Sequence, residues 1–130
     1  MTIASAKPVF QKLGLKPKHR AMVLNQPEDV VLGNLPAGVQ LQKQLDGQFD
    51  FILTFCVTLA DLVKQLPQLK KFMTKSGMLW VCWKKGNVTD MGRDSIGPVV
   101  DSIGLEGVSL VSINSTWSSF KLMYPKSDRI

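Results

Sequence analysis

Three short apolar runs constrain the fold of this chain more than any other feature. They are Arg20–Leu24, Phe49–Phe55 and Met78–Trp83, of which the last is the most apolar. Runs of this length with little polar alternation are typical of strands covered on both faces, as in a parallel sheet. Helical patterns lie between the runs, so the sequence predicts a doubly wound α/β fold.

Periodicity and turn residues predict the remaining elements. A capping box at Thr58–Asp61 begins a long amphipathic helix, which Pro67 is expected to kink or split and Gly77 to end. Two strands joined by the short turn Asn114–Thr116 are expected to form an antiparallel hairpin, which closes a mostly parallel sheet of about six strands. In chain order, the expected elements are helix 8–13, strand 20–24, helix 27–32, strand 39–43, strand 49–55, helix 58–76, strand 78–83, helix 89–103, strand 108–113 and strand 117–124.

Length and composition are those of one globular domain. The 130 residues fit a single domain over 1–130, of which 1–7 are expected to form a loose tail. The hydrophobic content of 45% is ordinary, and no apolar run is long enough to span a bilayer. Cys56 and Cys82 lie in apolar runs and are interpreted as reduced core thiols of a cytoplasmic protein. Because His19 is the only histidine, no metal site is expected.

The pattern resembles the C-terminal half of a class I S-adenosylmethionine methyltransferase. Residues 49–53 resemble the fourth strand of that fold, residues 69–81 its helix, turn and fifth strand, and the closing hairpin its last two strands. A closer likeness is to a family of small bacterial domains of unknown function with a methyltransferase-related, Rossmann-like fold, carried by residues 12–17, 23–27, 77–85, 89–94 and 117–121. That likeness implies a reduced class I methyltransferase-like fold and no established activity.

The turn after the first strand departs from the methyltransferase pattern. Those enzymes carry glycines there, so that backbone N–H groups can approach the cofactor. Here Asn25–Asp29 contains no glycine, and Pro27 has no N–H to offer. Glu28 and Asp29 are expected in the first turn of the following helix, where they would oppose an anion. Lys43–Gln44 stands where an acidic residue usually holds the ribose, and a third strand–helix unit is missing, so the cofactor pocket is interpreted as dismantled or rebuilt.

Candidate binding residues lie where the strands end, because ligands of open α/β sheets bind beyond the carboxyl ends of the strands. They are Asn25, Gln26, Glu28, Thr54, Trp83, Lys84, Asp90 and Arg93. Each also has a structural interpretation, such as a turn residue, a tryptophan that caps the core, or an ion pair of Asp90 with Arg93. Cys56 is interpreted as a core thiol, and Trp117 reaches the same rim only if the hairpin leans inward. No acid–base pair or nucleophilic constellation stands out, so no catalytic residue is expected.

The charge distribution leaves a nucleic-acid function open. Residues 1–20 and 64–85 contain several lysines and no acid, in a chain of net charge +6. Such stretches attract polyanions, although solvated surface is the simpler interpretation. The leading hypothesis is a non-catalytic domain that binds a protein partner or a small ligand in the strand-end crevice. The alternatives are a divergent S-adenosylmethionine-dependent methyltransferase and a nucleic-acid-binding accessory domain. The residues themselves predict no cofactor and no membrane contact; S-adenosylmethionine is implied by the resemblance alone.

Overall fold

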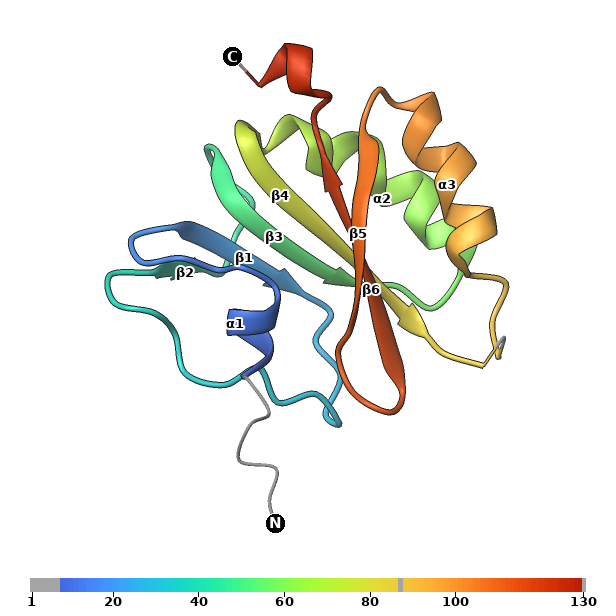
Figure 1. Ribbon diagram of the computed structural model, residues 1–130, viewed down its shortest axis with the longest axis horizontal. Helices are drawn as coiled ribbons and strands as arrows, with labels where there is room; N and C mark the ends of the chain where they lie inside the picture. Colours follow the sequence, from blue (N-terminus) through green and yellow to red (C-terminus); the bar gives the residue numbers. More distant parts are fainter. Residues whose placement is uncertain (1–7, 87, 130) are drawn as a thin grey trace.

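A computed structural model describes residues 8–86 and 88–129, so the expected tail over 1–7 lies outside the described residues. Its centre is a six-stranded sheet in the order β2-β1-β3-β4-β6-β5 (Figure 1). The predicted class, a doubly wound and mostly parallel α/β fold, is confirmed. In chain order the elements are α1 (Val9–Lys12), β1 (Arg20–Leu24), β2 (Gln40–Gln42), β3 (Phe49–Phe55), α2 (Leu59–Lys71), β4 (Met73–Lys84), α3 (Arg93–Ser102), β5 (Glu106–Ser112), β6 (Trp117–Met123) and the 3-10 helix η2 (Lys126–Asp128).

The sheet reverses its order at β1. The chain passes from β1 to β2 on one side and then crosses to β3 on the other side, and all three strands run parallel. β4 continues the parallel sheet beside β3, whereas β6 pairs antiparallel with both β4 and β5. The last two strands are therefore the expected hairpin. The reversal at β1 creates a switch point, the place where open α/β sheets bind ligands.

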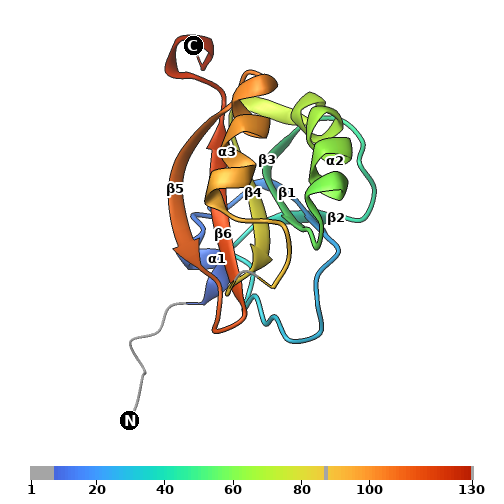
Figure 2. The ribbon, with the colours of Figure 1, turned by 90° about the vertical axis from the view of Figure 1, so that its right-hand side faces the viewer.

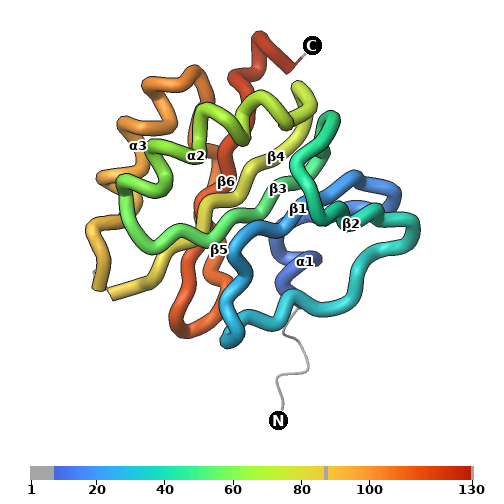
Figure 3. Tube along the Cα trace, turned by 180° about the vertical axis from the view of Figure 1, so that it is seen from behind, coloured from blue at the N-terminus to red at the C-terminus, as the bar shows by residue number. Residues whose placement is uncertain are grey.

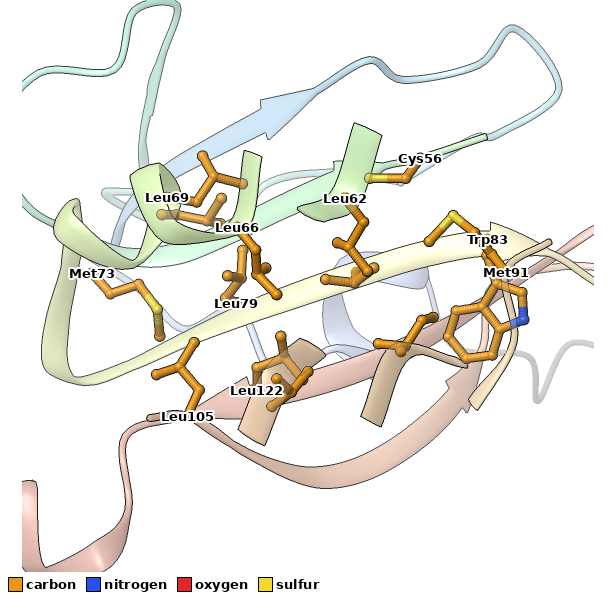
Figure 4. Packing of buried hydrophobic residues seen from close by; sticks show 14 of the residues in the cluster. Cys56, Leu62, Leu66, Leu69, Met73, Leu79, Trp83, Met91, Leu105 and Leu122 are labelled. Carbon is orange, nitrogen blue, oxygen red and sulfur yellow. The ribbon is translucent and has the colours of Figure 1, made fainter. Parts of the chain in front are cut away.

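Helices cover the two faces of the sheet unequally. α2 and α3 lie side by side on one face (Figures 2 and 3), over a core that includes Leu62, Leu79 and Leu122 (Figure 4). Within the described residues, the other face carries the single-turn helix α1 and the connection over 25–39, which together bury residues such as Phe51. β3 and β4 are thus buried on both faces, which explains why their sequences are almost continuously apolar.

The predicted helix over 27–32 does not form. Residues 27–30 make a single turn, in which the Val30 N–H donates to the Pro27 carbonyl at 3.2 Å, and the chain then continues without a helix. Its burial alternates: Val30 is 3% exposed, Val31 80% and Leu32 6%. A period of two is that of an extended chain, whereas a helix this short would turn only one of these side chains toward the sheet. The Leu32 carbonyl accepts from the N–H of Phe10, which ties the segment to α1. Tertiary burial therefore overrides the local helix signals of Pro27 and the acids that follow.

The predicted stop at Gly77 is also wrong, because Gly77 lies inside β4. The register of β3 with β4 shifts between Phe49 and Phe51, and a Cβ at Gly77 would come within 3.0 Å of the Phe49 carbonyl. Glycine is therefore needed for a close backbone approach and not for a helix end. Pro67 does not split α2, since a single helix runs through it. The helix ends at Phe72, whose N–H donates to the Leu69 carbonyl.

The helix predicted from Thr89 begins four residues later, at Arg93. The Thr89 hydroxyl accepts from the N–H of Met91 at 3.1 Å and makes a turn, while Ser95 accepts from the N–H of Gly92 at 2.9 Å at the start of α3. Among the described residues, no helix combines the length and the apolar character that crossing a bilayer requires.

Candidate functional site

A crevice opens at the carboxyl ends of β1, β3 and β4, at the switch point of the sheet. Its volume is about 460 Å³, within the range of small-molecule sites. It is lined by Asn25, Pro27, Phe55, Cys56, Val57, Asp61, Gln65, Lys84 and Trp117. The lining combines two aromatic rings, one cation, one carboxylate and two side-chain amides. This mixture suits a small organic ligand held by a few polar contacts.

The turn after β1 forms one side of the crevice. Asn25 adopts a positive φ of 60°, a left-handed conformation that asparagine tolerates better than most residues. Pro27 follows it and offers no N–H donor. No helix forms anywhere in residues 25–39, so this turn contributes no helix N-terminus to the crevice. The expectation that Glu28 and Asp29 occupy a helical first turn is therefore wrong.

Asp29 instead fastens this turn to the β5–β6 hairpin. Its carboxylate accepts from the indole N–H of Trp117 at 3.2 Å, and its carbonyl accepts from the side-chain amide of Asn114 at 3.1 Å. Trp117 is only 3% exposed, so its N–H needs this partner. The hairpin consequently leans inward and brings Trp117 to the crevice.

One wall of the crevice is aromatic and has a lysine beside it. The rings of Phe55 and Trp117 meet edge to face with their centroids 5.2 Å apart. The Lys84 ammonium lies 5.8 Å from the centroid of the Trp117 ring, within cation–π range. Lys84 forms no ion pair within residues 8–86 and 88–129. The wall therefore offers an apolar surface with one positive charge beside it.

The opposite wall comes from the end of β3 and the first turns of α2. Gln65 Oε1 accepts from the fully buried Thr54 hydroxyl at 3.2 Å, which orients the amide. Cys56 Sγ lies 4.0 Å from the same oxygen. Burial is the main cause that raises the pKa of Cys56 to about 11, so its thiol stays protonated at neutral pH and is a poor nucleophile. Thr58 caps α2, because its hydroxyl accepts from the backbone N–H of Asp61 at 3.2 Å, and Asp61 also lines the crevice.

Only two of the predicted site residues, Asn25 and Lys84, line the crevice, with Thr54 one layer behind. Gln26 lines a different groove, beside β2, where its amide donates to the Val30 carbonyl. Glu28 is exposed and lines neither cavity. Most of the crevice is therefore lined by residues that the sequence did not single out as candidates.

The other predicted residues lie away from the crevice. Trp83 belongs to the core that α2 and α3 cover, where it packs beside Met91 (Figure 4). Asp90 accepts from the N–H of Leu59 at 2.8 Å and so stabilises the start of α2. It makes no ion pair with Arg93 within the described ranges, and both line a separate hollow at the start of α3.

Sequence reasoning missed Asp61 and Gln65, which the fold places in the crevice. Their four-residue spacing puts both on one face of α2, a signal that was present in the sequence. The capping box interpreted Asp61 as a residue that stabilises the start of the helix, and no motif in the sequence singled out Gln65. Phe55, Val57 and Pro27 also line the crevice, and they lie within three residues of the predicted Thr54 or Gln26 in the sequence.

A smaller hollow of about 210 Å³ continues the crevice toward β1 and α2. It shares Asn25 and Gln65 with the crevice and is otherwise lined by Leu24, Leu45, Gln68 and Leu69. The two hollows together form an uncharged lobe and a charged lobe on either side of Asn25. Among the described residues, no three histidine, cysteine, aspartate or glutamate side chains gather as metal ligands would.

The two lysine-rich stretches do not form one platform. Lys12 and Lys85 meet at Ser112, where they donate to its carbonyl and its hydroxyl at 3.0 and 2.6 Å. Lys75 lies elsewhere, 4.4 Å from the centroid of the Tyr124 ring. Several of these lysines therefore have contacts within the fold itself.

Three solved structures that resemble this chain in fold are methyltransferases. A SAM-dependent methyltransferase from Aquifex aeolicus superposes with a TM-score of 0.58 at 14% identity, over 90% of this chain and 88% of the other. Magnesium protoporphyrin IX methyltransferase from Synechocystis PCC 6803 gives 0.60 at 9% identity, over 90% and 78%. The ribosomal protein L11 methylase of Lactobacillus delbrueckii subsp. bulgaricus gives 0.57 at 12%, over 88% and 74%.

The fold is that of a class I methyltransferase. Identities this low establish the architecture alone. No protein-family model and no curated protein matches the sequence. The sheet also lacks, within the described residues, the third strand–helix unit expected of the methyltransferase fold, because its order ends at β2.

The turn after β1 does not fit the cofactor cradle that the resemblance implies. That cradle needs free backbone N–H groups on a glycine turn and a helix N-terminus behind them. Pro27 lacks the donor, residues 25–39 contain no helix, and the Asp29 carboxylate is engaged by Trp117. Lys43 follows β2 in place of an acid for the ribose. The residues present therefore disagree with S-adenosylmethionine bound in the manner of these enzymes.

Proposed function

We propose that this chain is a methyltransferase-like domain that binds a small ligand in the switch-point crevice and transfers no methyl group. The observation that carries the proposal is the turn after β1, where Asn25 and Pro27 lead into a connection that contains no helix. An anionic end of a cofactor would find neither a row of N–H donors nor a helix dipole there. A crevice is nevertheless present at the switch point, which supports ligand binding without methyl transfer.

The lining supports a ligand with a flat apolar part and one anionic group. Phe55 and Trp117 provide the aromatic surface, and Lys84 provides the cation next to it. Gln65 offers an oriented amide on the opposite wall. A negatively charged group beside Lys84 would gain a charge-assisted hydrogen bond.

Benzoate is a suitable probe because it combines a flat ring with one carboxylate. In a 15N-labelled protein, benzoate should shift the amide signals of Cys56, Gln65 and Lys84. Lys84→Ala should weaken binding at least fivefold, in keeping with the loss of one charge-assisted hydrogen bond of about 1.5 kcal/mol. Lys121→Ala is the matched control, since Lys121 lies 5.9 Å from the Trp80 ring outside the crevice. Shifts confined to other surfaces would contradict the proposal.

Calorimetry with S-adenosylmethionine and S-adenosylhomocysteine tests the absence of methyl transfer. We expect no binding of either compound at micromolar concentrations. A dissociation constant below about 10 μM for either compound, equivalent to roughly −7 kcal/mol, would overturn this part of the proposal.

A divergent methyltransferase is the second candidate, and one observation favours it. Asn25 adopts the left-handed conformation that glycine commonly supplies in a tight turn, and its side chain lies between the two lobes of the crevice. The solved methyltransferases of this fold include one with bound S-adenosylhomocysteine. Native mass spectrometry of the purified protein should then reveal a bound nucleoside that Asn25→Ala loses and Gln26→Ala retains. Without such a compound, this candidate fails.

A further inference from the structure

The sheet has an open edge at β2. No other strand pairs with β2 on that side within the described residues (Figure 1). On the inner side, Gln40 donates to the His19 carbonyl at 2.9 Å, in parallel register with β1. Because successive residues of a strand bond in opposite directions, the N–H and carbonyl of Leu41 face the open edge. Such unpaired groups are a template for another strand.

An apolar groove of about 500 Å³ runs beside this edge on the α1 face. It is lined by Phe10, Val23, Gln26, Val30, Val31, Leu32, Gly33, Asn34, Leu35 and Leu41, none of which is charged. Val31 is 80% exposed, Leu41 45% and Leu35 41%. These large apolar side chains gather next to unpaired backbone groups, which is a combination typical of an interaction surface.

We propose that β2 pairs antiparallel with β2 of a second copy of this chain, about a twofold axis at Leu41. In this arrangement the two Leu41 residues exchange both N–H···O bonds, and their side chains lie on the same face. The grooves of the two copies then adjoin, so that Val31 and Leu35 of each copy become covered. The two sheets join into one continuous sheet across the axis.

The absence of charged residues at this edge favours a second copy of the chain as the binding partner. The chain carries a net charge of +6, yet residues 39–42 and the groove lining contain no charged residue. An uncharged surface offers no ion pair to an acidic or basic segment, and the best complement to it is an uncharged, apolar strand. Residues 39–42 of another copy are uncharged, and their apolar residues Val39 and Leu41 alternate with glutamines and so share one face. Pairing about Leu41 places no like charges directly opposite each other.

The apolar side chains of the groove compensate for the few hydrogen bonds that the short strand β2 can form. β2 spans only Gln40–Gln42, so few backbone hydrogen bonds are available at the edge. Burial of the exposed side chains of Val31, Leu35 and Leu41 adds the apolar area on which association mainly depends. Substitutions of these side chains should therefore weaken the dimer as strongly as a blocked backbone.

Sedimentation velocity over about 5 to 500 μM full-length chain tests the proposal, since this range brackets weak to moderate dissociation constants. The wild type should pass from monomer to dimer as its concentration rises. Leu41→Pro removes the outward N–H and the Leu41 side chain but no hydrogen bond to β1. It should therefore raise the dissociation constant at least tenfold while the fold, checked by circular dichroism, is kept. Val31→Lys changes the most exposed side chain of the groove and should have a similar effect.

Val108→Lys is the matched control, because Val108 is 46% exposed on β5, at the opposite edge of the sheet. It should leave the dimer intact. A wild type that stays monomeric over the whole range would overturn the proposal, as would a dimer that Val108→Lys dissociates and Leu41→Pro does not.

Discussion

At the scale of single residues, the candidate site depends on side chains that join distant segments. Asp29 holds Trp117, and Gln65 receives the Thr54 hydroxyl. Neither pair is visible from sequence spacing, because the partners are separated by 88 and 11 residues. The residues of the crevice therefore depend on long-range hydrogen bonds as much as on the strand ends that frame it.

Asp29→Ala should lower the free energy of unfolding by about 1 to 3 kcal/mol, because it leaves the buried Trp117 N–H without an acceptor. Urea unfolding followed by tryptophan fluorescence measures the change. Asp29→Asn keeps an acceptor oxygen and should cost less. Glu28→Ala, at the exposed neighbour, should stay within about 0.5 kcal/mol of the wild type. Equal losses for Asp29→Ala and Glu28→Ala would contradict the assigned hydrogen bond.

Cys56 should make stability fall at high pH. Its pKa is raised from 9.0 to about 11 in the folded state, mainly by burial. Between these values the unfolded chain loses the thiol proton and the folded chain keeps it, so rising pH favours unfolding. The stability of the wild type relative to Cys56→Ala should be constant below pH 8 and decline from about pH 9 to 11. Urea titrations at several pH values measure it, and a flat difference would refute the raised pKa.

At the scale of elements, tertiary contacts reassign segments whose local signals pointed elsewhere. Residues 27–32 form no helix because Val30 and Leu32 are both buried while Val31, between them, is exposed. α2 continues through Pro67 because its buried side, which includes Leu62, Leu66 and Leu69, packs on the sheet along the whole helix. Packing of an amphipathic face outweighs the local cost of one lost backbone hydrogen bond.

Pro67→Ala should stabilise the protein. Pro67 is exposed within α2 and withholds a donor from the helix, and a helix-interior proline costs about 3 kcal/mol. Roughly 1 kcal/mol of this is returned by the greater freedom of the unfolded chain in the variant. A net gain of about 2 kcal/mol in chemical denaturation is therefore expected. Gln68→Ala should change stability by no more than about 0.5 kcal/mol; a destabilised Pro67→Ala would show that the helix is adapted to the proline.

At the scale of the whole molecule, β3 and β4 form a spine between two unequal layers. Both strands are almost fully buried, and each is paired on both sides. β2 and the connection over 25–39 lie at the margin, with much of their length exposed. The candidate crevice and the proposed dimer edge both adjoin this marginal connection.

Native-state amide hydrogen exchange should reflect this division. The slowest amides should lie in β3 and β4, because their exchange requires the largest opening of the core. Amides of residues 33–38 should exchange fastest among the described segments between strands. Exchange followed by mass spectrometry of peptides measures both. Slow exchange over 33–38 together with fast exchange in β4 would contradict the architecture.

The sequence was enough to predict the order of the strands along the chain, the parallel centre of the sheet and the closing hairpin. Each depends on local periodicity and turn chemistry, which act within a few residues. It also determined that the turn Asn25–Asp29 has no glycine. Tertiary contacts exclude a helix after this turn, bring Trp117 and Gln65 to the crevice, and keep Trp83 and Asp90 away from it. These outcomes depend on which face each side chain buries and on hydrogen bonds between distant segments, which a linear pattern does not encode.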